Sequence, residues 1–218
     1  MKPAGDGHYF TEQALRDWTA IAEKHRLRDQ YFLRRLEPYF RSGPILEIGA
    51  ATGHLSAILN QRGYDVTASD VSPRFVAASA ARGVPALCVD ATGDIRLQTG
   101  RIFANILAQN VIPLIRRDRD LILATLTAIH AALETSGRMI CITARTACCP
   151  DPGAFLSPSE LLAITKNSGL FRILATFPHQ VVPTGLYRRW NAPILNFADF
   201  ALARIAAVRL VSILEKNA

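Results

Sequence analysis

The sequence predicts an α/β protein with a doubly wound, mostly parallel sheet and helices on both of its faces. Short apolar runs alternate with helical patterns along the chain, which is typical of right-handed βαβ units. In residues 45–59, ILEIGAATGHLSAIL, an apolar strand runs through a glycine-containing turn directly into a helix. The 218 residues have the length of one α/β domain, so we expect residues 1–218 to form a single domain.

An N-terminal helical cap is predicted over residues 1–42. Apolar side chains recur at helical spacing between residues 11 and 40. They form two stripes, which are Ala14, Trp18, Ile21 and Ala22, and then Tyr31, Phe32, Leu36, Tyr39 and Phe40. Ser42, Gly43 and Pro44 then end the helical pattern.

The core of the domain is predicted over residues 43–149, followed by a C-terminal part over residues 150–218. We expect core strands at 45–48, 65–69, 86–89, about 102–108 and 138–143, with helices at 55–61, 73–82 and 119–133. In the C-terminal part a helix opens at Ser157, which offers a capping hydroxyl before Pro158, and ends near Gly169. Two further strands, 171–177 and 209–214, complete the sheet around a long insert over residues 178–207.

The composition is that of an ordinary soluble protein, with 50% apolar and 20% charged residues. No run of about 18 apolar residues is present, and the first ten residues have no apolar core of a secretion signal, so we expect a cytoplasmic protein without a membrane span. Cys88 and Cys141 are expected as buried free thiols. Cys148 and Cys149 lack partners at zinc-ligand spacing, so no metal is expected.

The net charge of +7 is spread along the chain in small clusters of arginine. A basic tail or an aromatic-rich basic strip, which would indicate nucleic-acid binding, is missing. We therefore do not expect a nucleic-acid substrate. The sequence gives no indication of the oligomeric state.

The glycine turn points to a bound ligand, because the carboxyl ends of parallel strands form the usual ligand crevice of such sheets. A dinucleotide-binding turn reads G-x-G-x-x-G, and residues 49, 51 and 54 match it only at Gly49. The turn also follows a carboxylate, Glu47, within an apolar strand. A buried carboxylate near a cationic ligand offsets the cost of its own desolvation, and a role in capping or orienting the loop is the alternative.

This stretch resembles the first motif of the class I S-adenosylmethionine-dependent methyltransferases, in which an acidic residue precedes G-x-G/A-x-G. Glu47, Gly49, Ala51 and Gly53 fit that motif, and Ala50 lies within it. The resemblance extends over roughly residues 40–215 with the further motifs in order. It implies a Rossmann-like, seven-stranded sheet with an antiparallel last strand, and S-adenosylmethionine as cofactor.

The further motifs assign the rest of the cofactor site by the same resemblance. Asp70, which ends the second strand, is expected to accept hydrogen bonds from both ribose hydroxyls, with Val71 beside it. After the third strand, the resemblance implies that Asp90 and Ala91 contact the adenine. The remaining expected contacts, beneath the cofactor at the end of the fourth strand, are Gln109 and Asn110. The family usually has Phe-Asp at the start of this strand, and Ala104 stands in place of that aspartate.

The acceptor is expected to be a small molecule that is methylated on O or N, in a biosynthetic tailoring pathway. The N/D-P-P-Y/F signature of enzymes that methylate nucleobases and amides is missing, since Gln109 and Asn110 occupy its place. Tyr187, Arg188, Trp190 and Phe197 of the insert are candidates for the acceptor pocket, or else form an aromatic lid packed on the sheet edge. Tyr9 is a candidate in the N-terminal segment, which often closes over the cofactor in this family.

His179 is the candidate general base, because it follows the sixth strand where the insert begins. A surface histidine in a loop is the alternative interpretation. His54 is expected to be structural, and Arg26 or Arg28 is a candidate for the cofactor's carboxylate. Two other functions stay open at this point: methylation of RNA or protein, which the net charge favours, and a cofactor-binding interaction module without transferase activity.

Overall fold

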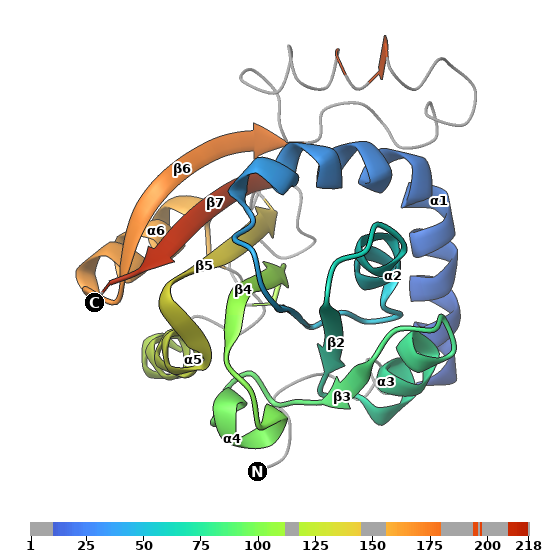
Figure 1. Ribbon diagram of the computed structural model, residues 1–218, viewed down its shortest axis with the longest axis horizontal. Helices are drawn as coiled ribbons and strands as arrows, with labels where there is room; N and C mark the ends of the chain where they lie inside the picture. The colour runs from blue at the N-terminus through green and yellow to red at the C-terminus, as the bar shows by residue number, and fades with distance from the viewer. Residues whose placement is uncertain are drawn as a thin grey trace.

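The computed structural model shows one seven-stranded sheet with the strand order β3-β2-β1-β4-β5-β7-β6 (Figure 1). It describes residues 11–111, 118–144, 156–179, 194, 195, 197 and 209–217. All neighbours pair in parallel except β7, which is antiparallel to both β5 and β6. The strands are β1 (Ile45–Ile48), β2 (Val66–Asp70), β3 (Ala86–Cys88), β4 (Phe103–Gln109), β5 (Leu133–Ala144), β6 (Phe171–His179) and β7 (Arg209–Lys216). The predicted fold class is confirmed.

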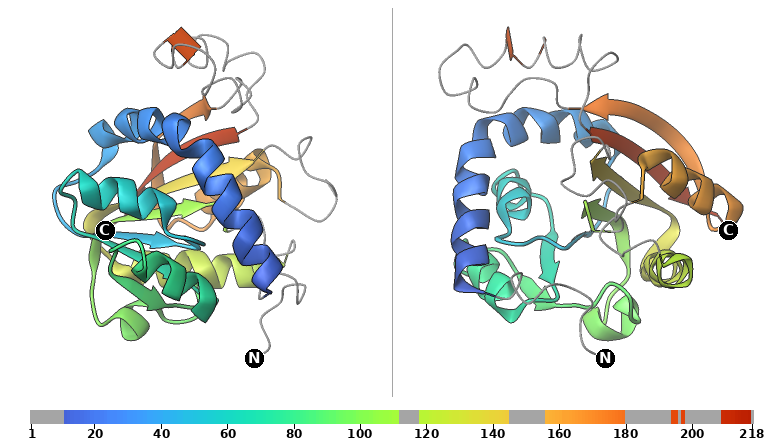
Figure 2. Two further views of the ribbon diagram at one scale, coloured as in Figure 1. Left: turned by 90° about the vertical axis from the view of Figure 1, so that its right-hand side faces the viewer. Right: turned by 180° about the vertical axis from the view of Figure 1, so that it is seen from behind.

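Helices cover both faces of the sheet and divide the core in two (Figures 1 and 2). One face carries α1, α2 (His54–Gln61) and α3 (Pro73–Ala80), and the other carries α4 (Ile95–Thr99), α5 (Arg119–Ala132) and α6 (Pro158–Asn167). Side chains of β1 alternate between the two cores, because Ile45 packs with α1 and α2 while Leu46 and Ile48 pack with α5. The chain order reverses between β1 and β4, so the ligand crevice is expected at their carboxyl ends.

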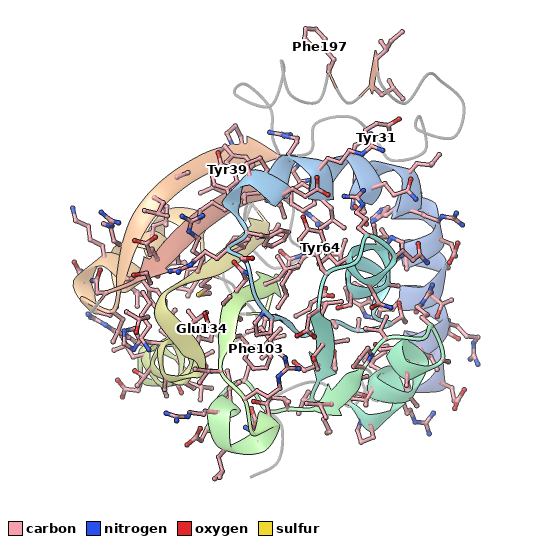
Figure 3. The ribbon with its side chains drawn as sticks, in the orientation of Figure 1. Tyr31, Tyr39, Tyr64, Phe103, Glu134 and Phe197 are labelled. Carbon is pink, nitrogen blue, oxygen red and sulfur yellow. The ribbon has the colours of Figure 1, made fainter. Side chains whose placement is uncertain are left out.

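The long helix α1 (Glu12–Leu36) bends sharply, so that one arm runs beside α2 and α3 and the other crosses beside the ends of β6 and β7 (Figures 1 and 2). Its sequence contains neither proline nor glycine. The second arm, on which Tyr31 lies (Figure 3), buries Phe32, Leu33 and Leu36 against the sheet and leads into the 3₁₀-helix η2 (Glu37–Tyr39). Half of the first predicted stripe is not buried, since Trp18 and Ile21 are 38% and 39% exposed.

Several local predictions need correction. The five-residue helix α4 was not predicted, because its apolar content is too short to show a helical period. Strand β5 begins at Leu133, earlier than expected, and its ladder with β4 is interrupted by a bulge at Ser136, whose φ is +56°. Cys88 is exposed because β3 is an edge strand, whereas Cys141 is buried as predicted.

Within the described ranges, none of the helices has the length and apolar character needed to cross a membrane.

The predicted cap of α6 is confirmed in detail. Ser157 accepts from the N–H of Glu160, and the Glu160 carboxylate accepts from the N–H of Ser157.

Candidate functional site

The turn between β1 and α2 is built from left-handed backbone conformations. Gly49, Ala51 and Gly53 have φ angles of +65°, +47° and +67°. Contacts within the protein require glycine at two of these positions. A Cβ on Gly49 would lie 2.3 Å from Cγ2 of Val111, and one on Gly53 would lie 2.5 Å from Oγ of Ser79. These glycines therefore allow neighbouring side chains of the protein to approach the turn closely. The sequence did not indicate these contacts.

Glu47 caps helix α2 from within strand β1. The N-cap residue Gly53 has no side chain, and the Glu47 Oε2 accepts hydrogen bonds from the N–H of Ser56 at 2.9 Å and from its hydroxyl at 2.5 Å. A carboxylate at a helix N-terminus is stabilised by unpaired N–H groups and by the helix dipole. Capping is thus one reason for a carboxylate in this strand, as one of the two interpretations of the sequence expected.

The charge of Glu47 is nevertheless poorly stabilised. Burial raises the pKa of Glu47 to about 7, the hydrogen bonds from Ser56 act in the opposite direction, and the nearby carboxylates Asp29 and Asp70 raise it further. The charge of Asp29 is offset by its ion pair with Arg28, so the negative charge beside the glycine turn comes from two carboxylates, Glu47 and Asp70. Their field favours a positively charged ligand group and disfavours an anion such as a pyrophosphate.

Asp70 ties the end of β2 to the glycine turn. Its Oδ2 accepts from the N–H of Ala51 and its Oδ1 accepts from the N–H of Ser72, both at 2.9 Å. The side chain is buried. A carboxylate oxygen has two lone pairs and can accept more than one hydrogen bond.

The remaining strand ends place the other predicted cofactor residues on the same edge of the sheet. Val71 exposes 36% of its surface directly after Asp70, which leaves an apolar side chain at the crevice. Asp90 accepts from both the N–H and the hydroxyl of Thr92 and so holds the turn that precedes α4, while Ala91 is partly buried against the core. Asn110, after β4, has a left-handed φ of +57°.

Of the three non-glycine residues with positive φ in the described chain, two are Ala51 and Asn110, at the ends of adjacent strands. Left-handed backbone in a residue with a side chain is strained and is retained where the surroundings enforce it, commonly at functional sites. Gln109, the last residue of β4, is half-buried beside Asn110. The strain therefore concentrates where β1 and β4 diverge.

A second polar region lies between α1 and α2. Arg28 and Asp29 are buried and form an ion pair at 2.5 Å, and Nε2 of His54 lies 3.5 Å from the other oxygen of Asp29. Burial raises the pKa of Asp29, but hydrogen bonding to His54 and the charge of Arg28 outweigh it and lower the pKa below its usual value. His25, one turn earlier on α1, has its pKa lowered to about 4 by burial and by Arg28.

This polar region continues to the far edge of the sheet through α1. The imidazole of His179 stacks on the ring of Phe32, with centroids 3.9 Å apart and planes 18° from parallel. His179 is 2% exposed, and its Nδ1 is buried without a hydrogen-bond partner. Its cross-strand partner is Arg209, the first residue of β7, so the two side chains leave the sheet on the same face.

Solved structures that match this architecture include methyltransferases. The chain matches an N-methyltransferase, NodS, from Bradyrhizobium japonicum, with a TM-score of 0.64 at 16% identity over 89% of this chain and 88% of that one. It matches a TehB-like methyltransferase from Corynebacterium glutamicum with a TM-score of 0.66 at 16% identity over 95% and 100% of the two chains. This is the S-adenosylmethionine-dependent methyltransferase fold.

A third match, the glycopeptide N-methyltransferase MtfA, has a TM-score of 0.63 at 15% identity and covers 88% of this chain and 90% of that one. No protein-family model matches the sequence. No curated protein matches it either. The likeness is thus one of fold, and the roles of individual residues have to be argued from the geometry of this chain.

Within the methyltransferase fold, the structure brings together most of the predicted cofactor residues. Glu47 and the turn from Gly49 to Gly53 adjoin Asp70, and the ends of β3 and β4 lie on the same edge of the sheet. Tyr9, Tyr187, Arg188 and Trp190 lie outside the described residues. Phe197 is 70% exposed and points away from the sheet (Figure 3), which does not support a role in the wall of a pocket.

His179, the predicted candidate base, is the buried last residue of β6 and not a surface residue in a loop. Sequence reasoning missed Asp29 and Arg209 beside it. One signal was present, because Asp29 shares the helical spacing of Phe32, Leu33 and Leu36, which places a carboxylate on the buried face of α1. Arg28, one of two candidates for the cofactor's carboxylate with a surface position as the alternative, is buried and engaged with Asp29.

Proposed function

We propose that this protein is a methyltransferase that uses S-adenosylmethionine to methylate a small molecule on N or O. The observation that carries the proposal is the convergence of Glu47 and Asp70 at the glycine turn, at the carboxyl edge of a methyltransferase fold. A cofactor with an ammonium and a sulfonium relieves the mutual repulsion of these carboxylates. A dinucleotide, whose pyrophosphate is anionic, increases it.

The residues around the turn suit the parts of this cofactor. The backbone from Gly49 to Gly53 would border its methionine portion, and Glu47, whose Oε2 accepts from both the N–H and the hydroxyl of Ser56, would act on the ammonium through its charge. Asp70, which is buried at the end of β2, would accept from the ribose hydroxyls. Val71 supplies apolar surface for the adenine, beside Asp90 and Ala91. The end of β4, at Gln109 and Asn110, would lie beneath the sulfonium.

When bound, S-adenosylmethionine would supply a methyl group attached to a good leaving group. The nucleophile of the acceptor would take this methyl group by in-line attack, and S-adenosylhomocysteine would be the leaving group. The protein then has to orient the two reactants and exclude water. A base is needed where the nucleophile carries a proton. The candidate base His179 is neutral, but burial and then the charges of Arg28, Arg35 and Arg209 hold its pKa well below the usual value, which makes its imidazole a weak base.

The acceptor is proposed to be small because NodS and MtfA, which share this fold over most of the chain, are named as N-methyltransferases, MtfA of a glycopeptide. The proposal is tested by calorimetry with S-adenosylmethionine, its demethylated product S-adenosylhomocysteine, and NAD. We expect the first two to bind and NAD not to bind. Binding of NAD alone would overturn the proposal, and transfer of labelled methyl to a small-molecule extract would establish the activity.

A further inference from the structure

The residues at the meeting point of β6, β7 and α1 form a second polar site that the cofactor contacts above do not use. Nδ1 of His179 is buried and has no hydrogen-bond partner. A buried nitrogen without a partner is costly, and such groups in native proteins call for an explanation. The ring is held by the stack on Phe32, so its nitrogen is fixed in place without being satisfied.

Arg209 provides a cation next to this nitrogen. It faces His179 directly across the β6–β7 ladder, and within the described part of the chain its side chain forms neither an ion pair nor a hydrogen bond. Burial and the neighbouring Arg28 lower the pKa of Arg209 to about 10, so the surroundings of Arg209 destabilise its positive charge. An anion bound between His179 and Arg209 would relieve both groups.

The site is connected to the glycine turn. Phe32 lies one turn after Arg28 and Asp29 on α1, and Asp29 lies 3.5 Å from His54, the first residue of α2. A series of neighbouring residues, His179, Phe32, Asp29 and His54, therefore leads from the end of β6 to the start of α2. In the described residues no three His, Cys, Asp or Glu side chains come together in a way that could hold a metal ion.

We propose that His179 and Arg209 bind a carboxylate of the methyl acceptor, so that the substrate class is a small acid with an amine or hydroxyl to be methylated. This inference rests on the function proposed above. A guanidinium and a neutral imidazole in the tautomer with a proton on Nδ1 offer donors to both oxygens of a carboxylate. The acid group then anchors the acceptor, and in this role His179 holds the acceptor and does not act as its base.

The test is a calorimetric titration of the S-adenosylhomocysteine complex with benzoate and with its uncharged analogue benzamide. We expect benzoate to bind at least about tenfold more tightly than benzamide, because only the anion gains charge-assisted hydrogen bonds. Arg209→Gln should weaken benzoate binding about tenfold or more. His179→Phe, which keeps the stack on Phe32, should weaken it by several-fold, and it keeps the test valid if Arg209→Gln does not fold.

Arg172→Gln is the matched control, because Arg172 lies at the opposite end of β6 and is exposed in its ion pair with Glu215. It should leave benzoate affinity within about twofold. Equal binding of benzoate and benzamide, or an equal loss in the Arg172 and Arg209 variants, would overturn the proposal. A parallel loss of S-adenosylhomocysteine affinity in Arg209→Gln would also overturn it, since the anion would then be the cofactor's own carboxylate.

Failure of this inference is distinguishable from failure of the proposed function. Absence of S-adenosylhomocysteine binding by the unmodified protein would reject the methyltransferase proposal. A titration with benzoate alone then tests the anion site separately. Benzoate binding that depends on Arg209 under those conditions would keep the anion site and remove only its assignment to a methyl acceptor.

Discussion

The two polar regions at the carboxyl edge of the sheet differ in how far the protein satisfies them. Around the glycine turn, Glu47 and Asp70 accept from Ser56, Ala51 and Ser72, so each buried carboxylate already has donors. At the far edge, Nδ1 of His179 has no partner. The carboxylates of the first region thus have donors before any ligand binds, whereas Nδ1 of His179 has none; near the turn, Oγ of Ser72 and Nε2 of His54 are also buried without a partner.

This difference separates two ways of building a binding site. A turn with three left-handed residues needs internal hydrogen bonds to hold its shape, and the carboxylates provide them. A group that recognises a ligand by direct hydrogen bonds must keep its atoms free, and this lowers the stability of the protein. The predictions below test this contrast, beginning with the largest expected effect.

The largest effect is expected from Gly49→Ala, because the new methyl group would lie 2.3 Å from Val111 at a φ of +65°. The left-handed backbone costs about 1–2 kcal/mol and the steric clash about 1–3 kcal/mol more. Urea unfolding should show both losses. Gly63→Ala is the control, since Gly63 has a φ of +85° and no atom within 4 Å, and it should show only the backbone cost. Equal losses of stability in the two variants would mean that Val111 moves away from the new methyl group without a cost in free energy.

Glu47→Gln should change how stability depends on pH. The folded pKa of about 7 lies above the ordinary value of 4.5, so the stability that the protonated Glu47 contributes is lost as the pH rises from 4.5 to 7. The loss is about 3 kcal/mol. Urea unfolding of the protein without ligand at pH 5 and pH 8 should show this loss for the natural protein, and a clearly smaller loss for Glu47→Gln.

The same variant tests the charge of the ligand. A cationic ligand favours ionised Glu47, so the affinity for S-adenosylmethionine should rise from pH 6 to pH 8 in the natural protein relative to Glu47→Gln. The comparison between variants cancels the titration of the ligand's own amino group. A ratio of affinities that does not change with pH would show that the ammonium lies too far from Glu47 to sense its charge.

Asp70→Ala should weaken binding of S-adenosylmethionine about tenfold or more, because hydrogen bonds to a charged acceptor contribute about 1.5–3 kcal/mol. Asp70→Asn should lose less, since one acceptor oxygen remains. The structure adds a second effect, because Asp70 also holds the N–H groups of Ala51 and Ser72. Calorimetry therefore has to accompany urea unfolding, and a folded Asp70→Ala protein with unchanged affinity would remove the ribose contact.

The smallest effect is expected from His179→Phe, and it has the opposite sign. Replacing the imidazole by a phenyl ring keeps the stack on Phe32 and removes a buried nitrogen without a partner. The free energy of unfolding should increase by about 1 kcal/mol. His179→Gln, which keeps a polar group and loses the stack, should be less stable than the natural protein. Equal losses of stability in both variants would show that the unpartnered Nδ1 does not lower the free energy of unfolding of the natural protein.

The sequence determined the sheet, its helices and the position of the turn, because these depend on local patterns. The apolar run at residues 45–48, the glycine stop near residue 63 and the capping hydroxyl of Ser157 each act within a few residues of where they stand. The motif around Glu47 and Gly49 likewise located one end of the crevice. These features depend on interactions between residues that are close together in the sequence.

Tertiary structure alone decided the partners of the polar groups. Glu47 caps a helix nine residues later, Asp70 holds a turn nineteen residues earlier, and His179 stacks on Phe32 from the N-terminal helix. No pattern in the sequence encodes these distances, because hydrogen bonds and ring contacts depend on the three-dimensional path of the chain. Whether a buried polar atom finds a partner is therefore known only once the bend of α1 has brought Asp29 to His54 and Phe32 to His179.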